Sequence, residues 1–171
     1  KQLRSRGVNV PILLLGASMD NDIEDIINFD VTPNVFSYEF AKAISYVAEK
    51  KEKVTKIHIK LDTGMSRIGY VVSDDNTEIV NEIEKISKLP YIEIEGIFSH
   101  FSTSDEYDGS YTRLQFNRFM SVIGDLEKCG VNIPIKHICN SAGIMMYPEM
   151  HLDMVRPGVI LYGMYPSDEV D

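Results

Sequence analysis

The sequence predicts an α/β protein of the (β/α)8 TIM-barrel type that is incomplete, with about six of the eight β/α units present. Short apolar runs alternate with amphipathic segments along all 171 residues, which is typical of parallel strands joined by helices. No run is followed by GxGxxG or a P-loop, and polar residues follow many runs rather than one pair of them. This spread favours a barrel over a doubly wound sheet, whose ligand site lies at one switch point.

The first third of the chain contains two expected strands and a short helix. Residues 1–10 read as the tail of a helix, and residues 11–16 form a continuous apolar run that ends in glycine. Such a run is typical of a strand buried on both faces. Asp20 or Asn21 is expected to cap a short helix, and residues 32–37 form a second, shorter strand.

The middle of the chain has the clearest periodicity. Ser37 is expected to cap a helix with a stripe of apolar residues on one side. A strand over 56–62 follows, and then a helix over 76–88 that stops before Pro90, because the residue preceding a proline disfavours helical geometry.

The last third contains the longest expected helix and three expected strands. The strands are expected over 92–101, 135–139 and 153–155, and the helix over 111–129, with Gly130 as the residue after its end. Because the barrel lacks two of its units, its terminal strands are expected to expose apolar edges that invite pairing.

Composition excludes several classes of function. The hydrophobic fraction is 44%, which fits one domain with a sizeable core. The net charge is −9, and no segment clusters lysine and arginine, so nucleic-acid binding is not expected. No apolar stretch approaches the roughly 20 residues that span a bilayer, and the first residues lack the apolar core of a signal peptide, so a cytoplasmic location is expected. Cys129 and Cys139 form no CxxC pair and are expected as buried thiols.

Alternation along residues 58–62 places His58, Lys60 and Asp62 on one face of the expected strand. If this face lines a barrel, Lys60 is buried, and burial lowers the pKa of an ammonium by up to about 3 to 5 units unless an anion accompanies it. Two interpretations remain open: a structural salt bridge between Lys60 and Asp62, or a functional lysine that is modified to an anion beside Arg67. Arg67 is also placed to bind a carboxylate or a phenolate.

Each of the four histidines has a structural interpretation. His100 follows the apolar run over 92–98 and lies at the end of the expected strand, where a single histidine is more often structural than catalytic. The same interpretation applies to His58, His137 and His151. No HxH or HxxxH spacing occurs among the four, so a metal site is not expected.

The last two expected strands are followed by HICNSAG and VRPGVILYG. Barrels often bind phosphate through the loops after strands 7 and 8, where glycine exposes backbone N–H groups and a hydroxyl adds a donor. Ser141, Gly158 and the amide of Val159 suit that role. Arg156 precedes them and is placed to face the phosphate or the ring of a cofactor that carries it.

Four segments carry a family resemblance: KLDTGMSRIG, GIFSHFSTSDE, HICNSAG and VRPGVILYG. In this order, they resemble the amino-terminal barrel domain of bacterial alanine racemases, which are pyridoxal 5′-phosphate (PLP) enzymes of the fold type III class. The match covers essentially all of residues 1–171. It implies a parent protein that converts L-alanine to D-alanine for peptidoglycan and works as a homodimer.

The resemblance also implies roles for matching residues. Lys60 aligns with a lysine that is carboxylated by carbon dioxide, and Arg67 with the arginine that pairs with this carbamate and approaches the cofactor phenolic oxygen and the substrate carboxylate. His100 and Arg156 match a hydrogen-bonded pair whose arginine contacts the pyridine nitrogen and disfavours its protonation. The implied catalytic residues are Lys60, Arg67, His100 and Arg156. The implied cofactor-binding residues are Leu15, Asn140, Ser141, Arg156, Gly158 and Val159.

Two parts of the family pattern are missing from the sequence. The Schiff-base lysine of the family lies in a VKANAYGHG-like motif on the first strand, which does not occur in residues 1–171. The second proton-transfer residue is a tyrosine from the carboxy-terminal β domain of the partner subunit, and that domain is absent as well. Racemisation by two bases needs both groups. The isolated chain is therefore expected to be inactive, as a partial barrel domain of a racemase.

Three alternatives stay open. A serine racemase of the resistance type shares these motifs and carries a membrane domain upstream. A PLP-homeostasis barrel is a second alternative, although HICNSAG and the lack of an SMGMS-type segment argue against it. A third is a non-catalytic remnant whose open edges pair with another chain. The racemase interpretation requires that one pocket gathers Lys60, Arg67, His100, Ser141, Arg156 and Gly158.

Overall fold

The computed structural model describes residues 1–170, which form one sheet of parallel strands with helices packed against it. The strands are β1 Asn34–Val35, β2 Thr55–Asp62, β3 Tyr70–Val71, β4 Ile92–Phe98 and β5 Ile135–His137. Their order is β1-β2-β4-β5, and β3 pairs with the end of β2. All these pairs are parallel, as predicted.

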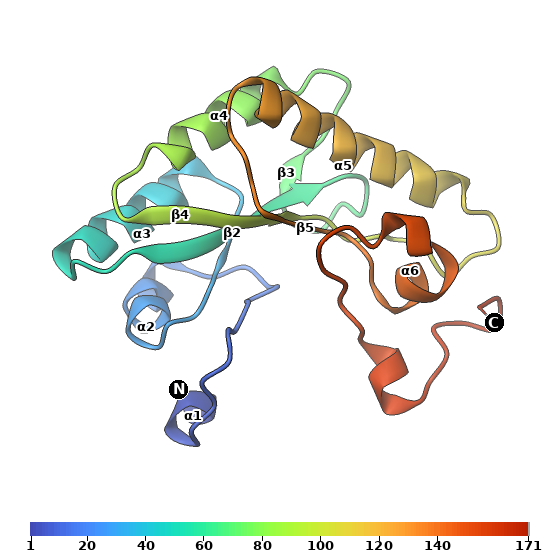
Figure 1. The fold of residues 1–171 in the computed structure, drawn as a ribbon, viewed down its shortest axis with the longest axis horizontal. Helices are drawn as coiled ribbons and strands as arrows, with labels where there is room; N and C mark the ends of the chain where they lie inside the picture. The colour runs from blue at the N-terminus through green and yellow to red at the C-terminus, as the bar shows by residue number, and fades with distance from the viewer. Residues whose placement is uncertain (171) are drawn as a thin grey trace.

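The helices form an outer layer in chain order. They are α1 Gln2–Ser5, α2 Ile23–Asn28, α3 Tyr38–Lys50, α4 Thr77–Ser87, α5 Ser110–Lys128 and α6 Ser141–Met146, with 3₁₀ turns η1 Asp20–Asp22, η2 Pro148–Met150 and η3 Val159–Tyr162. Consecutive helices from α2 to α5 contact one another. Figure 1 shows α4 and α5 on one side of the sheet, and the N-terminal and C-terminal segments on the other. Strands that curve inside a layer of helices form part of a (β/α)8 barrel.

The periodic helices match their predicted positions. The Ser37 hydroxyl accepts a hydrogen bond from the Phe40 N–H at 3.2 Å and so caps α3 as expected. α4 begins after Asn76 and ends before Lys88, within a residue of its prediction. Amphipathic spacing identifies these helices because each buries one stripe against the sheet.

The end of α5 confirms one prediction and overturns another. Gly130 has φ +80°, and the Val131 N–H donates to the Leu126 carbonyl at 2.9 Å, as expected for a helix that ends with a left-handed glycine. Cys139 is buried, but the expected burial of Cys129 is wrong, because Cys129 is exposed. It caps α5 next to Lys128, beyond the stripe that faces the core.

The central strand β2 is buried along both faces. Ile57, Ile59 and Leu61 have no exposed surface and belong to the core that the helices cover. His58 and Lys60 alternate with them and are each only 3% exposed. The concave face of the sheet is therefore polar, whereas the face under the helices is apolar.

The expected strand over residues 11–16 is wrong in length and in burial. Within this run, only Leu13 forms a β-bridge, with Thr32. The Leu14 N–H donates to the Thr32 carbonyl at 2.9 Å, and the Thr32 N–H donates to the Ile12 carbonyl at 2.8 Å. Leu15 is 46% exposed, so the run is not buried on both faces. Its other side has no neighbouring strand among the described residues, which leaves the predicted edge open.

The expected strand over residues 153–155 is also wrong. The Asp153 N–H donates to the Lys136 carbonyl at 3.1 Å, and the Arg156 N–H to the Cys139 carbonyl at 3.0 Å. These two contacts place an extended segment beside β5, but they do not form a ladder. The segment still brings Arg156 to the concave face.

Smaller differences concern element ends. Neither Asp20 nor Asn21 caps the first 3₁₀ turn, which instead starts after Met19, whose N–H donates to the Asp22 carboxylate at 2.9 Å. The strand expected to reach residue 101 ends at Phe98, and the one expected to reach residue 139 ends at His137. The sequence does not predict β3, because two residues carry no periodic signal.

Candidate functional site

The predicted cofactor-binding residues lie around one pocket of about 360 Å³, termed here the rim pocket. It is lined by Leu15, His100, Asp105, Asn140, Ser141, Ala142, Arg156, Pro157, Gly158, Val159 and Pro166. These residues come from the segments that follow β4 and β5 and from the extended segments at the two sheet edges. The rim pocket therefore lies at the carboxyl ends of the strands, where parallel barrels build their sites.

Hydrogen-bond donors gather on one side of the rim pocket. The Gly158 N–H donates to the Ser141 hydroxyl at 2.8 Å. An added Cβ at Gly158 would lie 3.4 Å from that hydroxyl oxygen, so a side chain would narrow this part of the pocket. The Asn140 side chain accepts from the Gly143 N–H at 2.9 Å and caps α6, which fixes the position of Ser141.

Arg156 provides a cation at the base of the rim pocket. Its Nη1 lies 2.5 Å from Nδ1 of His137, and its Nη2 donates to the carbonyls of Ser99 at 2.7 Å and Ile138 at 3.0 Å. Nη2 also lies 3.3 Å from Nδ1 of His100, so the two residues of the expected pair are in contact. Burial lowers the pKa of Arg156 to about 10, and the guanidinium remains cationic at neutral pH.

His100 is a neutral imidazole at pH 7. Burial, and after it the nearby charges of Arg156, Arg67 and Lys60, together lower its pKa to about 4. Because a guanidinium only donates hydrogen bonds, the contact with Arg156 requires a bare Nδ1 on His100. The proton of this imidazole therefore resides on Nε2.

Lys60 lies on the concave face beneath the rim pocket and does not line it. Its Nζ donates to the Leu61 carbonyl at 2.6 Å and lies 5.3 Å from the centre of the Phe98 ring. The pKa of Lys60 is lowered to about 8, mainly by burial; the charge of Asp62 opposes this shift, and the charges of Arg156 and Arg67 add to it. An appreciable fraction of this amine is therefore unprotonated near neutral pH.

The salt-bridge interpretation of Lys60 and Asp62 is wrong. One Asp62 oxygen accepts from the N–H groups of Gly64 and Ser66, each at 3.0 Å. Within residues 1–170, no ion pair joins Lys60 to Asp62. The carboxylate instead fixes the turn that leads to Arg67.

Arg67 lies apart from the predicted residues that line the rim pocket. It is exposed and does not line the rim pocket, although its charge lowers the pKa values of Lys60 and His100. Of the six residues required to converge, four line the pocket: His100, Ser141, Arg156 and Gly158.

Two residues that the sequence did not assign to the site support it. Gln115 on α5 is fully buried; its Oε1 accepts from the Ser102 N–H at 3.0 Å and its Nε2 donates to the His100 carbonyl at 3.1 Å. His137, interpreted as structural, contacts Arg156 directly. A glutamine on the apolar stripe of a predicted helix is a usable signal for Gln115, whereas the contact of His137 depends on tertiary structure.

The donor set of the rim pocket fits a phosphorylated aromatic ring. A hydroxyl, backbone N–H groups beside glycine and a guanidinium are the groups that bind phosphate oxygens and a ring nitrogen.

No helix among residues 1–170 is long and apolar enough to cross a membrane. In the same part of the chain, no three His, Cys, Asp or Glu residues are grouped to hold a metal ion.

Comparisons with known proteins agree with one another. A family model described as "Alanine racemase, N-terminal domain" matches residues 1–166. An alanine racemase of Clostridium tetani is 52% identical over 170 residues, and one of Methanococcus maripaludis is 48% identical over 169 residues. Both matches cover 99% of this chain, but only 43% and 44% of those proteins.

Solved structures show the same similarity. An alanine racemase of Clostridium difficile 630 in complex with cycloserine superposes with a TM-score of 0.95 at 44% identity, over 99% of this chain and 46% of that one. The alanine racemase of Bacillus anthracis with bound L-Ala-P superposes with a TM-score of 0.88 at 33% identity, over 98% and 42% of the two chains. The chain therefore spans less than half the length of these relatives.

Proposed function

The chain belongs to the alanine racemase N-terminal domain family, and on this basis we propose that it forms part of the barrel domain of an alanine racemase. The complete protein would convert L-alanine to D-alanine. The remainder of that protein would supply the first barrel strands with the Schiff-base lysine, and a carboxy-terminal β domain. The match to less than half of each relative's length supports this division.

The single observation that carries the proposal is the rim pocket. It gathers the six residues implied as cofactor-binding, although they come from three separate segments of the sequence. PLP, when bound, would act as an electron sink for the carbanion formed at the substrate Cα. One hydroxyl, two backbone amides and one guanidinium around this pocket support the proposal, because they are groups that could bind such a molecule.

Five residues of the rim pocket would hold the cofactor. Ser141 and the N–H groups of Gly158 and Val159 would bind the phosphate, and Leu15 would lie against the ring. Arg156 would donate to the pyridine nitrogen. Because a guanidinium has no proton to give up near pH 7 and accepts none, this nitrogen would stay unprotonated, which limits delocalisation and suppresses transamination.

Lys60 has the chemistry needed for carboxylation. Its unprotonated amine would attack carbon dioxide, with formation of an N–C bond and release of one proton. The anionic carbamate would then remove the unfavourable burial of a cation and would attract the guanidinium of Arg67. ¹³C NMR of protein equilibrated with ¹³CO₂ should show one carbamate signal that Lys60→Ala removes. A spectrum without such a signal in the unsubstituted protein would contradict the carboxylation.

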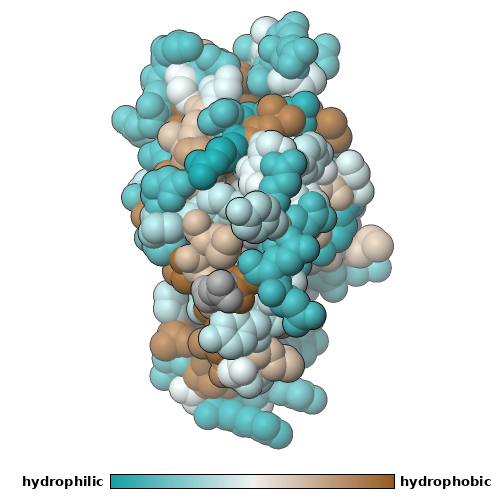
Figure 2. All heavy atoms as spheres, turned by 90° about the vertical axis from the view of Figure 1, so that its right-hand side faces the viewer, coloured by the Kyte–Doolittle hydropathy of each residue, from teal (hydrophilic) through white to brown (hydrophobic). Residues whose placement is uncertain are grey.

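The quaternary and cellular settings complete the proposal. The protein would act as a homodimer in the cytoplasm and supply D-alanine for the cell wall, with a tyrosine of the partner's β domain as the second base. Leu161 and Met164 are 70% and 54% exposed. Figure 2 shows apolar side chains at several places on a mainly hydrophilic face of the molecule. Exposed apolar side chains of this kind support contact with another part of the protein or another subunit.

The decisive experiment compares the full-length protein with the 171-residue chain. We expect the full-length protein, loaded with PLP, to form D-alanine from L-alanine, and the shorter chain to form none. Full-length protein that prefers L-serine would instead favour the resistance-type serine racemase. Full-length protein that binds PLP but racemises neither amino acid would contradict the proposal.

A further inference from the structure

A continuous series of polar side chains crosses the concave face of the sheet, from the rim pocket to the opposite strand ends. The contacts are Arg156 Nη1 to His137 Nδ1 at 2.5 Å, His137 Nε2 to His58 Nδ1 at 2.9 Å, His58 Nε2 to Glu95 Oε2 at 3.4 Å, and Glu95 Oε1 to Lys56 Nζ at 2.6 Å. We call these five residues the inner hydrogen-bond network. It comes from β2, β4, β5 and the last extended segment.

The two ends of the inner hydrogen-bond network determine its direction. A guanidinium only donates, so Nδ1 of His137 must be bare. Nε2 of His137 then carries the proton and donates to Nδ1 of His58, and Nε2 of His58 donates to the Glu95 carboxylate, which only accepts. One arrangement of protons satisfies every contact, with both imidazoles neutral.

The electrostatic surroundings agree with neutral imidazoles. Burial, with a smaller contribution from the charge of Arg156, lowers the pKa of His137 to about 2. Burial also lowers the pKa of His58, although the hydrogen bond and charge of Glu95 oppose it. Burial favours the neutral form of Glu95, but the contacts with Lys56 and His58 outweigh this and lower its pKa.

The strands are shaped to allow these contacts. Ile57 pairs with Ile94 and His58 with Gly96, so Glu95 is an extra residue on β4. Such a bulge redirects side chains. As a result, Glu95 and Phe98 both face the imidazole of His58. A Cβ on Gly96 would overlap with the His58 ring, which explains the glycine at this position.

Stacking holds the second imidazole. The rings of His137 and Phe98 are parallel within 3°, with centroids 4.8 Å apart. Among residues 1–170, Arg156 has no carboxylate as a hydrogen-bond partner: it contacts two imidazoles and the carbonyls of Ser99 and Ile138. Through the imidazoles of His137 and His58, the hydrogen bonds therefore connect Arg156 to one carboxylate, that of Glu95.

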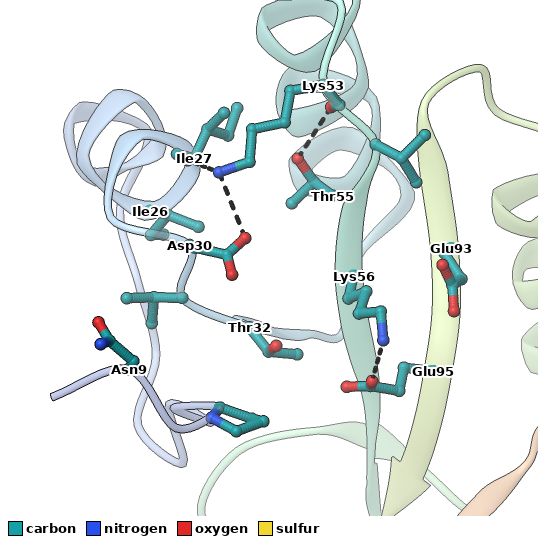
Figure 3. A pocket seen from close by; sticks show the side chains of 13 residues that line it. Asn9, Ile26, Ile27, Asp30, Thr32, Lys53, Thr55, Lys56, Glu93 and Glu95 are labelled. Carbon is teal, nitrogen blue, oxygen red and sulfur yellow. Dashed lines mark hydrogen bonds and ion pairs between the residues drawn. The ribbon is translucent and has the colours of Figure 1, made fainter.

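The far end of the inner hydrogen-bond network opens into a second cavity, of about 280 Å³, which we call the floor cavity. Figure 3 shows that Lys56 and Glu95 point toward each other at its edge, beside Glu93 on the same strand. The Lys56 side chain is 52% exposed and that of Glu95 19%. Access to solvent here allows Glu95 to remain ionised, whereas the imidazoles of His58 and His137 are buried away from solvent.

We propose that His137, His58 and Glu95 are positioning residues that fix the orientation of Arg156 through one directed line of hydrogen bonds. Their effect is to keep a full positive charge aimed at the rim pocket while its counter-charge stays on the other side of the sheet. A carboxylate in direct contact with Arg156 would neutralise this charge where it is needed. The inference rests on the proposed function, because it assigns Arg156 to the cofactor ring.

The test uses full-length protein labelled with ¹⁵N-histidine, without cofactor and at pH 7. We expect the imidazole signals of His58 and His137 to show bare Nδ1 and protonated Nε2. Glu95→Gln should leave the fold intact by circular dichroism but mix the two tautomers of His58. Glu93→Gln is the matched control, since it removes a carboxylate from the same cavity and strand without touching His58, and it should change neither signal.

A second readout separates positioning from structural support. With PLP bound, Glu95→Gln should lower kcat about 2- to 10-fold, the loss of one oriented hydrogen bond, and leave KM unchanged, whereas Glu93→Gln should change neither. His58→Gln interrupts the inner hydrogen-bond network at a second point and should reproduce the kcat effect if Glu95→Gln does not fold.

Two results would overturn the inference: His137 protonated at Nδ1 in the unsubstituted protein, or tautomers that Glu95→Gln does not alter. Because the NMR readout needs neither cofactor nor turnover, the expected tautomers in a protein that does not racemise alanine would contradict the proposed function alone.

Discussion

The two faces of β2 are buried to the same degree but are stabilised by different means. Ile57, Ile59 and Leu61 pack under the helices, whereas His58 and Lys60 on the concave side depend on directed partners. An apolar face requires only that its volume be filled, while each buried polar group requires a partner at a fixed angle. The comparison indicates that stability resides on the helix side of the sheet and chemistry on the concave side.

The largest expected effect tests the apolar face. Ile59→Ala should lower the free energy of unfolding of the full-length protein by about 2–5 kcal/mol, because it leaves a cavity in a fully buried core, and should leave the turnover of the folded fraction unchanged. Urea denaturation measures the first quantity. Val54→Ala, at a position that is 56% exposed, serves as control and should change stability by less than about 0.5 kcal/mol.

Arg156→Gln tests the concave side, where we expect a large loss of turnover and a smaller loss of stability. We expect turnover to fall about 100-fold, because a charged donor directed at the reacting group is lost, while unfolding free energy falls by about 1–3 kcal/mol from unpaired partners. Arg113→Gln removes an exposed arginine that pairs with Glu149 at the surface and should leave both unchanged. Equal losses of turnover in the two variants would argue against a separate role for the concave side.

Acidification should destabilise the protein through the buried histidines of the concave side. The folded-state pKa values are about 4 for His100 and about 2 for His137, both lowered by burial from 6.5. Between these values and pH 6.5, the unfolded state binds more protons than the folded state. The stabilisation is therefore complete above pH 6.5 and falls by about 1.4 kcal/mol per pH unit for each histidine as the pH decreases toward 4.

Denaturation curves at several pH values between 7 and 4 measure that slope. His100→Gln should reduce the slope, because it removes one of the buried imidazoles whose pKa is lowered. A slope that is the same with and without His100 would show that this imidazole is not held neutral by the fold.

The smallest effect is expected at the outer end of the inner hydrogen-bond network. Lys56→Gln removes an ion pair with Glu95 in which the lysine side chain is 52% exposed. Surface pairs of this kind contribute less than about 1 kcal/mol, so thermal unfolding should change little. A loss as large as that of Ile59→Ala would contradict the assignment of stability to the apolar face.

The sequence predicts the parts of the fold that depend on local periodicity. Four elements match their predictions within one or two residues: α3, α4, α5 and the central strand β2. In each of them, the spacing of apolar residues along the sequence identifies the buried face. The segments at 11–16 and 153–155 differ, since strand formation there depends on a neighbour and not on the segment itself. The same limit applies to β3, which pairs over two residues only.

The candidate site is predictable where short motifs carry its chemistry. Ser141, Arg156 and Gly158 line one pocket as expected. Spacing was misleading for Asp62, because its position on the same face as Lys60 suggested an ion pair. The Asp62 carboxylate instead accepts a hydrogen bond from the Gly64 N–H in the following turn. His137 was missed because its partner Arg156 lies 19 residues away in the sequence.

The most direct test of the account is a crystal structure of the full-length protein with PLP bound. We predict that the phosphate contacts the Ser141 hydroxyl and the N–H groups of Gly158 and Val159, and that the Arg156 guanidinium contacts the pyridine nitrogen. PLP bound outside the rim pocket, or an Arg156 that contacts a carboxylate and not the ring, would contradict it.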